Sequence, residues 1–321
     1  MKKIIVAAFI FLTACTATPA PVIEPTSIPL PTNTSPAVIP VSPNKTIIPT
    51  IESTGTAQPS PTTESPTNII SPVDGMPQVY IPVGTFRMGG MDVRRAPNEL
   101  PEHDVTLDAF WMDQLEVTNA MYGLCASAGA CTLPQELKSQ RRPDYFINPE
   151  FKDYPVIYVT WGQARTYCEW VGRRLPTEAE WERAGRGDDF RTFPWGEDKA
   201  NGLLVNFNML VGDTSRVGTY PAGASPFGVL DMAGNVAEWV NDYYSFDYSK
   251  LLENTLNPTG PETSSSFHRV VRGGSLGDAE INIRVSKRSS VLGSKLDAAP
   301  DSNAYLGDSS PRIGFRCAAD H

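Results

Sequence analysis

After about residue 73 of the 321-residue chain, short apolar runs alternate with polar loops. The run Val79–Val83 predicts a strand, and residues 84–89 predict a turn followed by a second short strand. Thr160 opens a capping-box pattern that predicts a helix. The apolar side of this helix carries Trp161, Ala164, Cys168 and Val171. A second capping box at Thr177 predicts a helix that ends near Gly185. Because the remainder is rich in Gly, Pro, Asn and Asp, the pattern predicts a loop-dominated fold with both helices and strands.

The first 14 residues have the pattern of a signal peptide. Lys2 and Lys3 precede the apolar run Ile4–Leu12, which is far shorter than the roughly 20 residues needed to cross a bilayer. The run ends in the sequence Leu-Thr-Ala-Cys, which resembles the lipobox of bacterial lipoproteins and places the cysteine at position 15. This resemblance implies removal of residues 1–14 and lipidation of Cys15, so we expect an extracytoplasmic protein anchored to a membrane through its lipid.

Residues 15–72 form a segment of different composition. Pro, Thr and Ser make up 32 of the 57 residues from 16 to 72, and none of these residues is aromatic. Such a segment cannot bury enough apolar area to offset its loss of chain entropy. We therefore predict a disordered tether over 15–72 and a single domain over 73–321, a length that suffices for one core.

The charge balance excludes nucleic acid as a partner. The formal net charge is −9 and the pI is about 4.9, so the chain as a whole repels phosphate backbones. The membrane contact that we expect is therefore the lipid on Cys15 and not an electrostatic attraction to anionic headgroups.

Four cysteines remain once Cys15 is assigned to the lipid. Cys125 and Cys131 enclose a short loop of small residues that suits a local disulfide, and Cys168 would then pair with Cys317. A metal site is the alternative, but no C-x-x-C spacing and no neighbouring histidine supports it.

Seven motifs follow one another through the predicted domain: Tyr80–Phe86, Glu116–Asn119, Arg174–Glu182, Pro194–Gly196, Gly228–Trp239, Arg272–Ser275 and Gly314–Cys317. In this order they resemble the formylglycine-generating enzyme, or sulfatase-modifying factor, family. The resemblance implies an irregular α+β fold of the C-type-lectin-like kind. It also supports the pairing of Cys168 with Cys317, since the cysteines at both positions are bridged in family members.

The same resemblance implies where catalysis would occur. Family enzymes hold copper(I) between two thiolates that follow the Gly-Gly-Ser motif, and soft sulfur ligands suit this ion. Here Asp278 stands at the first cysteine position and Ile283 near the second, and the whole stretch 276–284 contains no cysteine. We therefore expect no copper and no formylglycine-generating oxidase activity.

A structural calcium ion is the cofactor that the resemblance does imply. Its first site would use the side chains of Asp231 and Glu238 and the carbonyls of Gly234 and Val236. A second site would use Asn206, the Phe207 carbonyl and Asp213. The alternative for the first set is a turn in which Glu238 makes only hydrogen bonds.

Two functions remain open at this point. The polar segment 276–311 favours a binding or scaffold module for a protein or glycan ligand, with candidate contacts at Asp278, Asn282, Arg284 and Arg288. The alternative is an enzyme of the same family, either the oxidase itself or a periplasmic maturation enzyme, with catalytic residues that the sequence does not reveal.

Overall fold

The computed structural model describes residues 68–90, 93, 95–247, 252, 254–293 and 307–321. The predicted signal peptide, Cys15 and the tether as far as residue 67 lie outside these ranges. In the described part of the chain, no helix combines the length and apolar content that a membrane span requires.

One four-stranded antiparallel sheet joins the two ends of the domain. Its strands lie in the order β1 (Ile69–Ile70), β2 (Pro77–Ile81), β5 (Phe110–Asp113) and β10 (Ala318–Asp320). β2 confirms the first predicted strand. β1 pairs with β2 although it lies inside the predicted tether, so the boundary at residue 73 is a few residues too late. Backbone hydrogen bonds to β2 hold these two exposed isoleucines in the sheet, and such pairing cannot be predicted from composition.

The predicted second strand is half of a hairpin. β3 (Gly84–Met88) pairs with β4 (His103–Leu107), and Phe86 faces the core while Thr85 and Arg87 face solvent. The alternation follows from the two-residue side-chain period of a strand.

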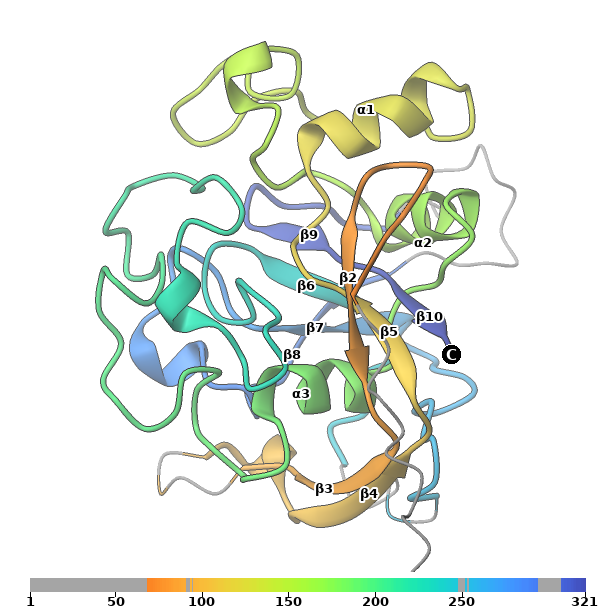
Figure 1. Cartoon of the computed structure of the whole chain (residues 1–321), viewed down its shortest axis with the longest axis vertical. Helices are drawn as coiled ribbons and strands as arrows, with labels where there is room; N and C mark the ends of the chain where they lie inside the picture. The colour runs from red at the N-terminus through yellow and green to blue at the C-terminus, as the bar shows by residue number, and fades with distance from the viewer. Residues whose placement is uncertain (1–67, 91–92, 94, 248–251, 253, 294–306) are drawn as a thin grey trace, which may run out of the picture. The chain divides into compact units, whose positions relative to one another are not determined.

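A second four-stranded sheet is less evident from the sequence. Its order is β8 (Ser289–Leu292), β7 (His268–Arg272), β6 (Ala237–Tyr243) and β9 (Ile313–Phe315), with β6 and β9 parallel. Figure 1 shows this sheet on one side of helix α3 and the β3–β4 hairpin on the other.

The α-helices begin where the sequence places N-caps. They are α1 (Asn119–Ser127), α2 (Trp161–Trp170) and α3 (Glu178–Arg186), and each starts after a threonine whose side chain accepts a backbone N–H. The last two have the predicted capping boxes. α3 ends at Arg186, one residue after the predicted stop, because the next residue, Gly187, adopts a positive φ of 75°. Short 3₁₀ turns cover Pro97–Glu99, Pro149–Phe151, Pro221–Gly223 and Glu280–Asn282.

Aromatic side chains and disulfides hold the layers together. Trp161, Trp181 and Trp239 are buried in the two main clusters of the core. Both predicted disulfides are present: Cys125–Cys131 closes the loop after α1, and Cys168–Cys317 joins α2 to the segment before β10. The loop-rich α+β prediction is confirmed.

Candidate functional site

A polar groove of about 420 Å³ lies against the second sheet, where the sequence places the catalytic motif. It begins after β7 at the Gly-Gly-Ser turn, in which Gly274 has a φ of 64° and a Cβ would stand 2.4 Å from the Asn282 carbonyl. Only glycine fits this turn. The groove is lined by Gly274, Ser275, Asp278, Asn282, Lys287, Ser289, Ser310 and Arg312, with Ala237, Val271, Val291 and Ile313 beneath them.

Asp278 and Ile283, which stand at and near the thiolate positions of the family's oxidases, have structural roles. Asp278 Oδ2 accepts hydrogen bonds from the Ser275 N–H at 2.8 Å and the Ser275 hydroxyl at 2.7 Å, which pins the loop. Ile283 is fully buried in a small core cluster with Phe193 and Val205. All four cysteines within the described residues are in disulfides. The groove therefore contains no thiol.

The structure adds a groove residue that the sequence analysis did not single out. Arg312 lines the groove, and its Nη1 lies 2.1 Å from the place that a Cβ on Gly277 would take. Arg312 Nε donates to the side-chain oxygen of Gln140 at 2.8 Å. A glycine at position 277 is consistent with a close approach by another side chain, but the sequence does not identify that side chain as Arg312.

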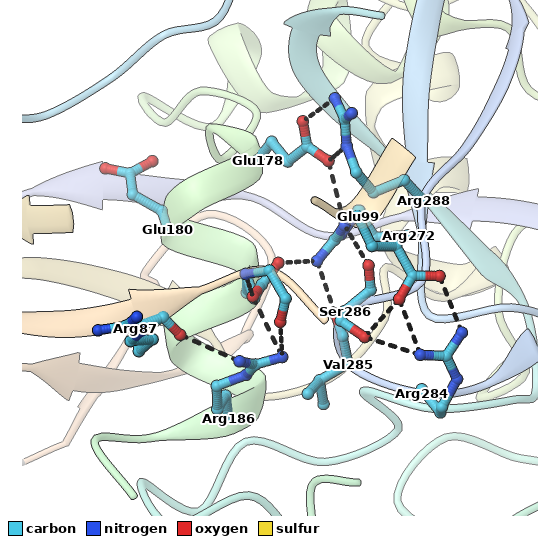
Figure 2. Close-up of polar contacts among 12 residues, drawn as sticks. Arg87, Glu99, Glu178, Glu180, Arg186, Arg272, Arg284, Val285, Ser286 and Arg288 are labelled. Atoms are coloured by element: carbon cyan, nitrogen blue, oxygen red, sulfur yellow. Dashed lines mark hydrogen bonds and ion pairs between the residues drawn. The ribbon is translucent and has the colours of Figure 1, made fainter. Parts of the chain in front are cut away.

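Two of the four predicted ligand contacts are wrong. Asp278 and Asn282 do line the groove, whereas Arg284 and Arg288 are 1% and 2% exposed. Arg284 binds both oxygens of Glu99 at 2.7 and 2.8 Å, and Arg288 binds both oxygens of Glu178 at 2.7 and 2.8 Å (Figure 2). Their guanidinium groups are held inside the protein and cannot contact a ligand.

These pairs belong to a buried ionic network around α3. Arg272, the residue before Gly-Gly-Ser, donates to Glu178 and to the carbonyl of Val285 (Figure 2). It also donates to Glu182. Arg186 follows Glu182 by one helical turn and pairs with it at 3.3 Å. Because the acids are on α3 and Arg272 and Arg288 lie on either side of the groove loop, the network fixes that loop to the helix.

The first predicted calcium set lies at a buried acidic cluster. Glu238 accepts from Arg316 with both oxygens at 2.7 Å and from the Trp181 indole at 2.7 Å, and Asp231 accepts from the Gly218 N–H. Glu116, which the sequence analysis did not assign to the site, accepts from the Val236 N–H. Burial raises the pKa of Asp231 to about 6 and raises that of Glu116 well above its usual range, helped by the neighbouring carboxylates.

The second predicted set adjoins the first. Gly234 lies against the Asn206 backbone, where a Cβ would stand 2.4 Å from the Asn206 carbonyl oxygen. The Asn206 side-chain oxygen is buried and accepts no hydrogen bond, whereas the Asp213 carboxylate accepts from Ser139 and from the Arg141 N–H. Phe207 packs partly buried beside this turn.

The ligand oxygens are therefore only partly free. Asn206 supplies one unsatisfied oxygen of the kind that calcium prefers, but the carboxylates of Glu238 and Asp213 already have donors. Among the described residues, no group of three or more acidic, histidine or cysteine side chains is placed to hold a metal ion. Calcium binding stays a prediction.

The comparison with known proteins decides the family. Residues 66–321 match the sulfatase-modifying factor enzyme 1-like domain. The chain belongs to this family. The formylglycine-generating enzyme of Mus musculus is 33% identical over 295 residues, which cover 76% of this chain and 75% of the mouse enzyme.

Other proteins similar to this chain differ in their names and in how much of their length it covers. The protein named serine/threonine-protein kinase pkn1 of Chlamydia pneumoniae is 36% identical over 222 residues, which cover 65% of this chain but only 34% of that protein. The hercynine oxygenase of Mycolicibacterium smegmatis is 33% identical over 246 residues, covering 65% of this chain and 56% of that enzyme.

Solved structures agree with the sulfatase-modifying factor fold. PvdO from Pseudomonas aeruginosa superposes with a TM-score of 0.64 at 27% identity, covering 80% of this chain and 99% of PvdO. The Treponema denticola variable protein 1 has a TM-score of 0.60 at 19% identity, covering 79% and 99% of the two chains, and this likeness concerns the fold alone. These neighbours confirm the predicted C-type-lectin-like architecture.

Proposed function

We propose that this protein is an extracytoplasmic, lipid-anchored member of the sulfatase-modifying factor family whose groove binds a ligand without oxidising it. The proposal depends above all on the absence of cysteine from residues 276–284, where the resemblance puts Asp278 at the first thiolate position of the family's oxidases and Ile283 near the second. A carboxylate held by Ser275 and a buried alkyl side chain can neither bind copper(I) nor supply a reactive sulfur.

The polar residues that line the groove support the proposal that it binds a ligand. Lys287 makes no ion pair with any residue of the described ranges, and Arg312 adds a second positive charge to the same lining. Asn282, Ser289 and Ser310 add neutral hydrogen-bonding groups. This set suits a protein or glycan ligand that is rich in hydrogen-bond acceptors.

The first test asks whether the groove is catalytic. The protein is incubated aerobically with copper(I) and a sulfatase-derived cysteine peptide, with the mouse formylglycine-generating enzyme as the positive control. We expect no aldehyde in the peptide by mass spectrometry. Aldehyde formation above the level of copper alone would overturn the non-catalytic proposal.

The second test asks whether the groove binds. Protein and glycan arrays are probed with the protein and with two variants, Lys287→Ala in the groove and Lys138→Ala, whose exposed side chain does not line it. We expect a ligand that Lys287→Ala weakens and Lys138→Ala leaves unchanged. The absence of any ligand, or equal binding by both variants, would remove the support for a binding groove.

The third test concerns the anchor. We expect the chain produced in a bacterial host to incorporate labelled fatty acid and to partition with membranes. The Cys15→Ser variant should lose both properties, because the thiol at position 15 is the attachment point of the lipid. Membrane partitioning that survives the substitution would show that another feature anchors the chain.

A further inference from the structure

One buried arginine differs from all the others in the described part of the chain. Eight arginines there are buried, and seven of them have a carboxylate oxygen within 4.0 Å. Arg269, which is 4% exposed, has no carboxylate oxygen within 4.0 Å among the described residues, and the Asp242 carboxylate acts on its charge only from farther away. Burying a charge without a directly paired counter-charge is unfavourable, so this exception calls for an explanation.

Two aromatic rings hold Arg269 in place without neutralising it. Its Cζ lies 3.8 Å from the ring centroid of Trp161 in α2 and 3.4 Å from that of Tyr243, the residue opposite it in β6. Nη1 donates to the Asn241 carbonyl at 2.6 Å, while the buried Nε has no acceptor. Burial lowers the pKa of Arg269 to about 10, so the guanidinium stays positive at neutral pH.

Arg269 lines a cavity of about 470 Å³ that shares no residue with the groove at Asp278. The Asn241 amide and the Tyr243 hydroxyl also line it, and within the described ranges neither has a hydrogen-bond partner. A second cavity of about 480 Å³ shares Arg174, Asn241 and Thr259 with the first, so the two adjoin. Uncommitted polar groups that converge in a cavity of this size are typical of a small-molecule site.

The remaining charges limit what such a site can accept. Arg165 pairs with Glu169 at 2.6 Å, and Arg174 is held by Glu180 and Asp320. Glu262 lies at the cavity as an exposed carboxylate. One available guanidinium beside one acidic side chain suits a ligand with a single negative charge better than a polyanion.

We propose that the cavity lined by Arg269 binds a small sugar acid, with its carboxylate on Arg269 and its hydroxyl groups toward Asn241, Tyr243 and Thr259. The planar guanidinium matches a carboxylate, and the neutral amide and hydroxyl groups match a polyol. The aromatic rings act on the arginine and not on the ligand, because they hold the guanidinium in place before the ligand arrives.

Calorimetry on the full-length protein tests the proposal with three probes at constant ionic strength. D-glucuronate carries both the carboxylate and the hydroxyl groups, D-glucose lacks the charge, and N-acetylglycine carries the carboxylate on a peptide group. We expect glucuronate to bind at least about tenfold more tightly than either of the others, since each lacks one set of contacts. Absence of glucuronate binding, or equal binding of glucose, would overturn the proposal. Equally tight binding of N-acetylglycine would overturn the sugar assignment in favour of a peptide carboxylate.

Two variants separate ligand recognition from a structural role of the arginine. Asn241→Asp keeps the size of the side chain and its backbone contacts but adds a carboxylate to the cavity. It should weaken glucuronate binding by about tenfold or more while the thermal midpoint stays near that of the parent. Arg269→Lys keeps the charge but loses the planar fork, so it should weaken binding also. Unchanged affinity in Asn241→Asp would show that Arg269 only fills the space between its two rings.

Discussion

Breaking the ion pair between Arg284 and Glu99 should destabilise the protein without directly removing a ligand contact. The two side chains are 1% and 0% exposed, and both oxygens of Glu99 accept from Arg284. The Ser286 hydroxyl adds a third donor to the same carboxylate at 2.8 Å. The substitution Arg284→Met removes two charge-assisted hydrogen bonds and leaves Glu99 buried with an unbalanced charge.

The expected magnitude follows from these contacts. Each hydrogen bond to a charged group contributes about 1.5–3 kcal/mol, and loss of one partner of a buried pair costs about 3–5 kcal/mol in total. We therefore expect Arg284→Met to lower the free energy of unfolding by about 3–5 kcal/mol. The double variant Glu99→Gln/Arg284→Met should lose clearly less than the sum of the two single variants, because the second change removes the stranded charge.

Chemical denaturation followed by tryptophan fluorescence measures these differences. Arg87→Met is the matched control, because Arg87 pairs with Asp104 at 3.5 Å while its side chain is 47% exposed. The control should lose no more than about 1 kcal/mol. If Arg284→Met lost no more than this control yet abolished ligand binding by the groove, Arg284 would be a ligand contact and the structural assignment would be wrong.

Two further predictions concern protons and calcium. Burial, with the nearby Glu178 carboxylate, raises the pKa of Asp242 to about 8, so the folded state binds this proton more tightly than the unfolded chain, in which aspartate titrates near about 4. This contribution to stability is complete below pH about 4 and is lost as the pH rises through about 8. The denaturation midpoint should thus decrease as the pH is raised from 5 to 8.5. The decrease should be smaller in Asp242→Asn, whose amide oxygen can still accept the Glu178 N–H. An unchanged slope in that variant would contradict the assignment to Asp242. Calcium added to chelator-treated protein should raise the thermal midpoint, by an amount equivalent to about 2.7 kcal/mol at a hundredfold excess over Kd. Asp231→Ala should reduce that shift, and no shift at millimolar calcium would end the calcium hypothesis.

Local signals in the sequence predicted the elements that depend on neighbouring residues. The capping boxes at Thr160 and Thr177 were confirmed because their hydrogen bonds join residues only three positions apart. The strand at Val79–Val83 and its hairpin neighbour also follow from side-chain alternation within a few residues. The boundary at residue 73 was wrong because the pairing of β1 leaves no mark on composition.

Contacts between distant residues were beyond such signals. The pattern of 276–311 predicted a polar recognition loop, yet Arg284 binds Glu99 across 185 residues and Arg288 binds Glu178 across 110. An arginine in a loop looks the same in the sequence whether its partner is a ligand or a buried acid. The burial of the partner decides between them, and burial is a property of the packed chain.

The sequence by itself shows that residues 276–284, which include Asp278 and Ile283, contain no thiol, and this is visible without any coordinates. It also determined the family, the disulfide pairs and the start of each predicted helix. Only the tertiary structure decided which charged groups are committed and which are free. Arg269 stands out only because Trp161 and Tyr243 are brought to its two sides while the other buried arginines of the described ranges each pair with an acid. The physical reason is that the energy of a charge depends on its surroundings, and the fold assembles those surroundings from parts of the chain that are far apart in sequence.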